Sequence, residues 1–229
     1  KKSENSTGLP GMICFEYQRV RGFIESRATT LFWNTVIDET APGYMFSTTP
    51  PVVYNWGFPT SKSSGQMSSN EIVWTVVVAA GSGARFGGQK QYALLGDQRV
   101  LDWSVETARL VSDGVVIVVP SEDVEREGGV AGGSTRSESV RNGLGAVPAD
   151  ATIICVHDAA RPFASEHLYR EVISQVVRGA DGAIPGLPVT DTIKQVSPTN
   201  VVIASPDRSS LVAVQTPQAF RASMLRDAH

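Results

Sequence analysis

Cysteine is scarce in this 229-residue chain. The two cysteines, Cys14 and Cys155, are too few for a disulfide framework and lack the clustered spacing of a zinc site. Cys155 lies inside the apolar run at residues 153–156. We therefore expect a buried thiol in a reducing compartment, which places the protein in the cytoplasm.

Long hydrophobic runs and a surplus of basic charge are also missing. No segment has the roughly 18 consecutive apolar residues that a membrane helix needs, and no apolar core of a signal peptide is visible. Twenty Lys and Arg against 23 Asp and Glu argue against a dedicated nucleic-acid-binding protein. The composition, 41% hydrophobic and 19% charged, predicts a soluble globular protein without membrane or nucleic-acid partners. An anionic small-molecule substrate stays open, because it needs only a few local cations.

The aromatic residues are concentrated before Met67. They recur there between breaker segments at residues 48–51 and 59–65, without helical or strand periodicity. Residues 1–66 are therefore predicted to be an extension of unknown role outside the core. Residues 67–229, which lead directly into an apolar strand, are predicted to be the folded domain.

From residue 71 onward, apolar strand patterns alternate with amphipathic helix patterns. Strands are predicted at residues 72–80, 115–119 and 151–156, with shorter ones at Ile184 and 211–214. Helices are predicted at residues 100–111, 135–145 and 166–178. This alternation predicts an α/β fold with a doubly wound, mostly parallel sheet. Ligands bind such sheets beyond the carboxyl ends of the strands, so chemistry is expected in the loops at residues 81–90 and 157–162.

A glycine-rich loop follows the first predicted strand. Residues 79–92 contain four glycines together with Arg85 and Lys90, so main-chain N–H groups and fixed positive charge could hold a triphosphate. The loop lacks the Gly-Lys-Ser/Thr of a Walker A motif and the third glycine of the dinucleotide fingerprint. An ordinary strand-to-helix turn with two solvated cations remains an equal alternative from these residues alone.

Two further segments carry candidate functional side chains. Gly132 and Gly133 lead into a helix start that could face a ligand, although an ordinary capped helix explains them as well. At the end of a buried strand, Asp158 suits Mg²⁺, which prefers one or two carboxylates with phosphate oxygens and water. The adjacent His157 is expected to be structural.

Five sequence strings in order resemble one family. They are Ala-Ala-Gly-Ser-Gly-x-Arg with Lys-Gln-Tyr (79–92), Gly-Gly-x-x-Arg-x-x-Ser-Val (132–140), Val-His-Asp-Ala-Ala-Arg-Pro (156–162), Pro-Val-x-Asp-Thr-Ile-Lys (188–194) and Gln-Thr-Pro-Gln-Ala-Phe (215–220). Together they resemble the 2-C-methyl-D-erythritol 4-phosphate cytidylyltransferases of the non-mevalonate isoprenoid pathway, over about residues 72–229. The resemblance implies a Rossmann-like sheet of the nucleotide-diphospho-sugar transferase type.

The resemblance also implies a reaction and its residues. CTP and methylerythritol phosphate would give 4-diphosphocytidyl-methylerythritol and pyrophosphate, with Mg²⁺ as cofactor. Position in the motifs then assigns catalysis to Arg85 and Lys90; nucleotide binding to Ala79, Ala80, Gly81, Gly83, Gly133, Ser139 and Asp158; metal binding to Asp158; and polyol-phosphate binding to Arg161, Thr192, Arg208 and Thr216.

An extended arm at about residues 189–210 matches the family segment that clasps a second subunit. The resemblance therefore implies a homodimer, with Arg208 and Thr216 reaching across from the partner.

The chain departs from the family pattern at three places. Gln89 stands where proline usually precedes the lysine, only eleven residues separate Pro120 from Gly132, and the chain stops nine residues after Phe220. We therefore expect a less rigid loop, a shortened or lost strand, and a C-terminal truncation that omits a substrate-binding lysine. Two alternatives follow: a cytidylyltransferase for another polyol phosphate such as ribitol 5-phosphate, and a nucleotide-binding module without activity.

Overall fold

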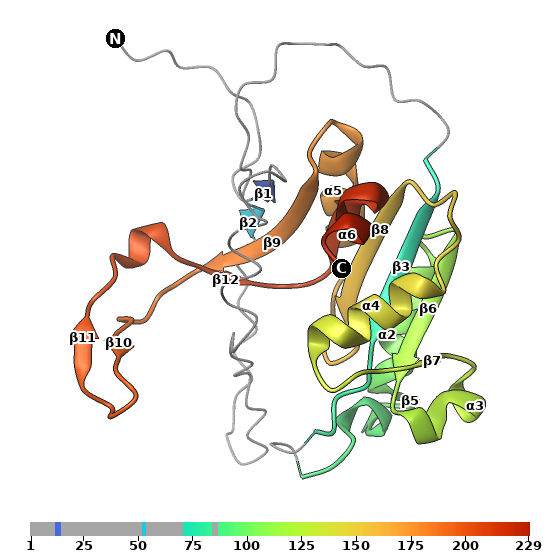
Figure 1. Cartoon of the computed structure of the whole chain (residues 1–229), viewed down its shortest axis with the longest axis horizontal. Helices are drawn as coiled ribbons and strands as arrows, with labels where there is room; N and C mark the ends of the chain where they lie inside the picture. Colours follow the sequence, from blue (N-terminus) through green and yellow to red (C-terminus); the bar gives the residue numbers. More distant parts are fainter. Residues whose placement is uncertain (1–11, 15–51, 54–70, 84–86) are drawn as a thin grey trace.

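The computed structural model describes residues 12–14, 52–53, 71–83 and 87–229, and these form a mixed sheet flanked by helices (Figure 1). The predicted arrangement of strand and helix is confirmed. The order of the main sheet is β1-β9-β13-β8-β3-β6-β7, with β2 and β12 also paired to β9.

The strands of this sheet are β1 (Met12–Cys14), β2 (Val52–Val53), β3 (Val73–Val78), β6 (Gly114–Val119), β7 (Val130–Ala131), β8 (Ile153–Asp158), β9 (Gly182–Pro188), β12 (Val212–Val214) and β13 (Gln218–Arg221). Neighbours β8, β3, β6 and β7 run parallel, whereas β13 lies antiparallel between β8 and β9. The expected mostly parallel, doubly wound core is therefore present; β13 is inserted antiparallel within it, and β1, β2 and β12 pair antiparallel with β9.

Helices cover both faces of the sheet. The longer helices are α2 (Val100–Arg109), α4 (Arg136–Gly145) and α5 (Glu166–Val177), and the shorter ones are α3 (Val124–Glu127) and α6 (Ala222–Asp227). Successive strand residues point to opposite faces, so Val77 packs with the α2 and α5 side chains while Val76 packs with those of α4 and α6. In the described residues, no helix is long and apolar enough to cross a membrane.

Short elements complete the chain. They are the 3₁₀ turns η1 (Lys90–Tyr92), η2 (Ser121–Asp123) and η3 (Arg208–Ser210), the hairpin of β4 (Leu94–Leu95) and β5 (Gln98–Arg99), and the hairpin of β10 (Gln195–Val196) and β11 (Val202–Ala204). Between Pro120 and Gly132, a four-residue helix and the two-residue strand β7 remain, which confirms the expected shortening.

Several element bounds differ from the sequence prediction. β8 continues through His157 and Asp158, which were expected to begin a loop, because both pair with β3. β13 (Gln218–Arg221) was not predicted as a strand, although its first residues belong to the string at 215–220. Before Met67, β1 and β2 both pair with β9, and the other residues of the predicted extension lie outside the described part of the chain.

Candidate active site

The carboxyl ends of three neighbouring parallel strands meet at one edge of the sheet. β3 ends at Val78, β6 at Val119 and β8 at Asp158, and Val78 is the direct register partner of Asp158. Beyond the end of β3, the Ala79 amide still donates to the Val118 carbonyl at 2.7 Å. The glycine loop and the His-Asp motif therefore lie at the same edge, as the sequence predicts for a ligand site.

A cavity of about 270 Å³ opens beside this edge, between the glycine loop and the second glycine pair. It is lined by Ala80, Ser82, Gln89, Pro120, Ser121, Glu122, Gly132 and Gly133. The two segments approach so closely that a Cβ on Gly132 would overlap the Cβ of Ala80. Glycine is needed at residue 132 for this contact, which forms one wall of the cavity.

The glycine loop is folded back on itself. Gly83 has a φ of +64°, and a Cβ there would overlap the carbonyl oxygen of Gly88. The buried side chain of Gln91 donates its Nε2 to the Gly81 carbonyl at 3.3 Å. Lys90 precedes Gln91 in η1 and so stands next to the closed loop. Arg85, the second cation predicted for catalysis, lies outside the described residues.

The segment that leads from Gly133 into α4 lies next to the cavity. Thr135 caps the helix by accepting from the Glu138 amide, as the capping-box spacing predicts, whereas the Glu138 carboxylate binds Ser134. The Gly133 amide donates to Ser139 Oγ at 3.0 Å. Two of the predicted nucleotide-binding residues are thus hydrogen-bonded to each other near a helix N-terminus, an end that favours anions.

Asp158 has a partner that the sequence analysis did not assign. Arg136 Nε lies 2.9 Å from Asp158 Oδ1. Burial raises the pKa of the Asp158 carboxyl, and the Arg136 charge opposes that rise. A cation in the first turn of a helix interacts unfavourably with the helix dipole. Arg136 is the first residue of α4 and the arginine of the Gly-Gly-x-x-Arg string, so its position could have indicated an acidic partner nearby.

Thr216 lies in the loop before β13 and contacts both Asp158 and His157. Its Oγ1 accepts from the Asp158 amide at 3.2 Å and lies 3.0 Å from His157 Nδ1. The structure corrects the expectation that Thr216 reaches across to a partner, because it is buried against β8 of its own chain. The full burial of His157 agrees with a structural role.

Arg161 follows the end of β8 and bonds to the Gln215 side chain through its NH1 group. Its amide donates to the Asp158 carbonyl at 2.9 Å, which keeps the loop close to the strand end. Burial lowers the pKa of the Arg161 guanidinium from its ordinary value. Gln215 was not predicted as a site residue, although it begins the Gln-Thr-Pro-Gln string that carries Thr216.

The remaining two predicted substrate residues lie on the arm. Thr192 and Arg208 flank the β10–β11 hairpin, and Arg208 NH1 donates to the Thr190 carbonyl at 2.8 Å. The hairpin extends away from the sheet (Figure 1). Within one chain, these two residues are therefore not brought to the cavity.

Acid stability should depend on His157. Burial lowers the pKa of His157 from 6.5 to about 3. Between these values the unfolded chain binds a proton that the folded chain does not, so the free energy of unfolding falls as the pH falls, by at most about 1.4 kcal/mol per pH unit. His157→Gln should flatten this slope in urea titrations from pH 7 to 4. An unchanged slope would contradict the assignment.

Comparison with known proteins places these strings in one family. The family model "IspD: 2-C-methyl-D-erythritol 4-phosphate cytidylyltransferase" matches residues 73–229. A protein named 2-C-methyl-D-erythritol 4-phosphate cytidylyltransferase from Rhodococcus jostii is 43% identical over 169 residues, which cover 69% of this chain and 74% of that protein. The bifunctional enzyme IspD/IspF of Solidesulfovibrio magneticus is 41% identical over 181 residues, covering 69% of this chain and 45% of that protein.

A solved structure of similar fold agrees. The 4-diphosphocytidyl-2C-methyl-D-erythritol synthase of Anaerococcus prevotii superposes with a TM-score of 0.60 at 27% identity, over 69% of this chain and 74% of that one. The chain thus spans less than half of the bifunctional relative and about three quarters of the single-function one. Because the family model matches residues 73–229, the chain belongs to the 2-C-methyl-D-erythritol 4-phosphate cytidylyltransferase family.

Proposed function

We propose that this protein is a cytoplasmic nucleotidyltransferase that transfers CMP from CTP to 2-C-methyl-D-erythritol 4-phosphate, releasing pyrophosphate. The observation that supports this most directly is the grouping at one sheet edge of the closed glycine loop, the turn that begins with Lys90, and Asp158 with Arg136. Family membership supplies the substrate class. The product, 4-diphosphocytidyl-methylerythritol, would serve isoprenoid precursor synthesis.

The chemical problem of this reaction is charge. An oxygen of the substrate phosphate, already anionic near neutral pH, attacks the α-phosphorus of CTP. The bond between the α-phosphorus and the oxygen that bridges to the β-phosphate breaks, and its electron pair leaves with pyrophosphate. Because no proton has to be removed from the nucleophile, catalysis depends mainly on positively charged groups held in position beside the phosphates. We assign this role to Lys90 and Arg85.

The nucleotide would occupy the cavity beside the two glycine segments. We assign nucleotide binding to main-chain groups at Ala79, Ala80, Gly81 and Gly83 on one side and to Gly133 with Ser139 on the other. Of these residues, Ala80 and Gly133 line the cavity. The positive end of α4 favours the ligand's negative charge.

Asp158 fits a role beside Mg²⁺. Its Oδ2 is buried and has no hydrogen-bond partner in the described part of the chain, so one carboxylate oxygen is available to a cation. Among the described residues, no group of three His, Cys, Asp or Glu could hold a metal ion by itself. Mg²⁺ is usually bound by one or two carboxylates together with phosphate oxygens, so Asp158 and the nucleotide would share its coordination. When bound, the metal would neutralise triphosphate charge.

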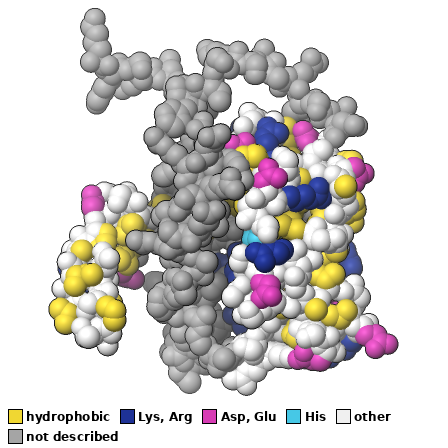
Figure 2. Space-filling model, viewed as in Figure 1, with side chains coloured by type: hydrophobic (Ala, Val, Ile, Leu, Met, Phe, Trp, Pro, Cys, Tyr) yellow, Lys and Arg dark blue, Asp and Glu magenta, His cyan; other side chains and the backbone are white. Residues whose placement is uncertain are grey.

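A homodimer would complete the site through the arm. Val196, Val202 and Ile203 on the β10–β11 hairpin are each more than half exposed, at 51%, 56% and 59%. Figure 2 shows hydrophobic side chains gathered on this hairpin. Such an apolar surface supports contact with a second copy, whose Arg208 and Thr192 would then reach the polyol phosphate beside Arg161 and Thr216.

Arg208→Ala should therefore weaken use of the polyol phosphate. Loss of one charge-assisted phosphate contact should raise the KM for methylerythritol phosphate about tenfold and leave the KM for CTP nearly unchanged. Steady-state kinetics with each substrate varied would measure both. Arg178→Ala, at an exposed arginine after α5, is the matched control. An effect confined to CTP would contradict the assignment across subunits.

Pyrophosphate release from CTP, Mg²⁺ and methylerythritol phosphate tests the function itself. Turnover that requires all three components is the expected result. Ribitol 5-phosphate is the comparison substrate, and faster turnover with it would move the assignment to another polyol phosphate. Binding of CTP without turnover of either substrate would instead favour a nucleotide-binding module.

A further inference from the structure

In the Lys-Gln-Tyr string, Gln91 and Tyr92 follow the lysine proposed for catalysis. Gln91 and Tyr92 complete the single turn η1 that begins at Lys90. Within the turn, the Tyr92 amide donates to the Gln89 carbonyl at 3.0 Å and the Ala93 amide donates to the Lys90 carbonyl at 3.1 Å. A 3₁₀ turn this short is weak alone, so side-chain contacts must hold it in place.

Tyr92 supplies such contacts to the segment after β6. Its hydroxyl donates to Asp123 Oδ2 at 2.8 Å. The guanidinium carbon of Arg126 lies 4.6 Å from the centre of the Tyr92 ring, and that of Arg99 lies 5.6 Å away. Burial and the bond to Asp123 raise the pKa of Tyr92 to about 12, so the hydroxyl keeps its proton at neutral pH.

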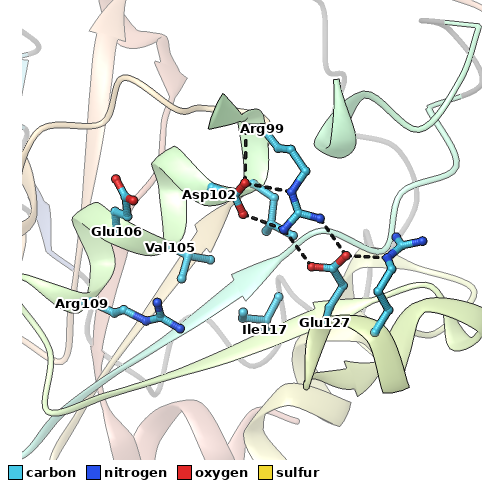
Figure 3. A pocket seen from close by; sticks show the side chains of 9 residues that line it. Arg99, Asp102, Val105, Glu106, Arg109, Ile117 and Glu127 are labelled. Carbon is cyan, nitrogen blue, oxygen red and sulfur yellow. Dashed lines mark hydrogen bonds and ion pairs between the residues drawn. The ribbon is translucent and has the colours of Figure 1, made fainter. Parts of the chain in front are cut away.

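The groups around Tyr92 are themselves tied together. Arg99 donates to Glu127 at 2.8 and 3.1 Å and to Asp102 at 2.7 and 2.8 Å, and Arg126 pairs with Asp123 at 2.9 Å and with Glu127 at 2.7 Å. Figure 3 shows Arg99 bridging Asp102 on α2 and Glu127 on α3. The Glu127 side chain is only 6% exposed, so this network is partly shielded from water.

We propose that Tyr92 is a positioning residue that holds the turn carrying Lys90 against Asp123 in η2, Arg126 in α3 and Arg99, the residue before α2. The inference rests on the proposed function, because Tyr92 would affect catalysis only by holding Lys90 in position. Gln89 precedes the turn and, unlike proline, has no ring that fixes its φ. The Tyr92 contacts on the C-terminal side fix the turn to η2, to α3 and to Arg99.

Hydrogen exchange tests this without any turnover. In Tyr92→Leu, which removes the hydroxyl and both ring contacts, amides of residues 87–93 should exchange at least about tenfold faster, while those of β3 and β8 stay unchanged. Tyr92→Phe keeps the ring and should show an intermediate effect. Glu106→Gln is the control, at an exposed residue of α2 that lines a pocket together with Arg99, Arg126 and Glu127. Unchanged exchange at residues 87–93 in Tyr92→Leu would overturn the proposal.

Kinetics test the link to Lys90. Tyr92→Leu should lower kcat about tenfold with the KM for CTP nearly unchanged, because a small displacement of a charged group weakens mainly the transition state. In a Lys90→Ala background the same change should alter kcat by less than about twofold. An equal loss in both backgrounds would show a general structural effect and overturn the proposal. A wild-type protein without turnover would count against the proposed function alone, and the exchange result would still decide the role of Tyr92.

Discussion

Lys90→Ala is expected to lower kcat at least a hundredfold. The attacking phosphate and the triphosphate are both anionic, so the barrier is dominated by charge that builds up at the α-phosphorus and on pyrophosphate. Loss of one preorganised charge at such a centre typically costs about 2.7–4 kcal/mol. Lys90 starts a turn fixed by Gln91 to the glycine loop and by Tyr92 to Asp123, so its charge is placed before substrate arrives.

The measurement is pyrophosphate release at saturating CTP and methylerythritol phosphate, with CTP affinity determined separately by calorimetry. Lys90→Arg keeps a charge and should recover part of the lost rate. Arg109→Gln removes an exposed cation from the far end of α2 and should change kcat by less than about twofold. An unchanged kcat in Lys90→Ala would remove Lys90 from the catalytic role.

Asp158→Asn should separate activity from stability. We expect turnover to fall about a hundredfold, because the amide no longer provides the charge proposed to hold Mg²⁺ and to orient the nucleotide. The melting temperature at neutral pH should stay equal or rise, because burial disfavours the ionised carboxylate in the folded chain. Asparagine retains an acceptor oxygen for Arg136, whose Nε lies 2.9 Å from Oδ1.

The sign of the pH dependence follows from the raised pKa of Asp158. A carboxyl whose folded pKa lies above its unfolded value contributes stability at low pH, and that contribution is lost as the pH rises through the folded value. The stability of Asp158→Asn relative to wild type should therefore increase from pH 4 to pH 8. Thermal melts across this range test it. A variant that becomes less stable than wild type as the pH rises would show that the pairing with Arg136 outweighs burial.

The parts of the site that could be predicted are those encoded by local sequence. Apolar runs and helical spacing located β3, β6 and β8 and the helices α2, α4 and α5 to within a few residues, since each pattern lies in one element. The glycine loop and Asp158 could be placed at a common edge for the same reason, because parallel strands end together.

The residues that could not be predicted depend on pairs far apart in the chain. Arg136 meets Asp158 across 22 positions, and Tyr92 meets Asp123 across 31. No spacing rule links such residues, because the contacts arise only when α4 and η2 pack at the ends of neighbouring strands. The same holds for β13, whose short polar string becomes a strand by filling the space between β8 and β9.

Local sequence was enough to predict the α/β class, the glycine loop and the order of the strings that identify the family. These follow from periodicity and residue type, which act over a few neighbours. Three contacts arise only from the packing of the whole chain: Thr216 hydrogen-bonds to Asp158, Arg136 pairs with Asp158, and Tyr92 links the Lys90 turn to Asp123. Such pairings depend on which strands and helices become neighbours, and that is set by packing of the whole core.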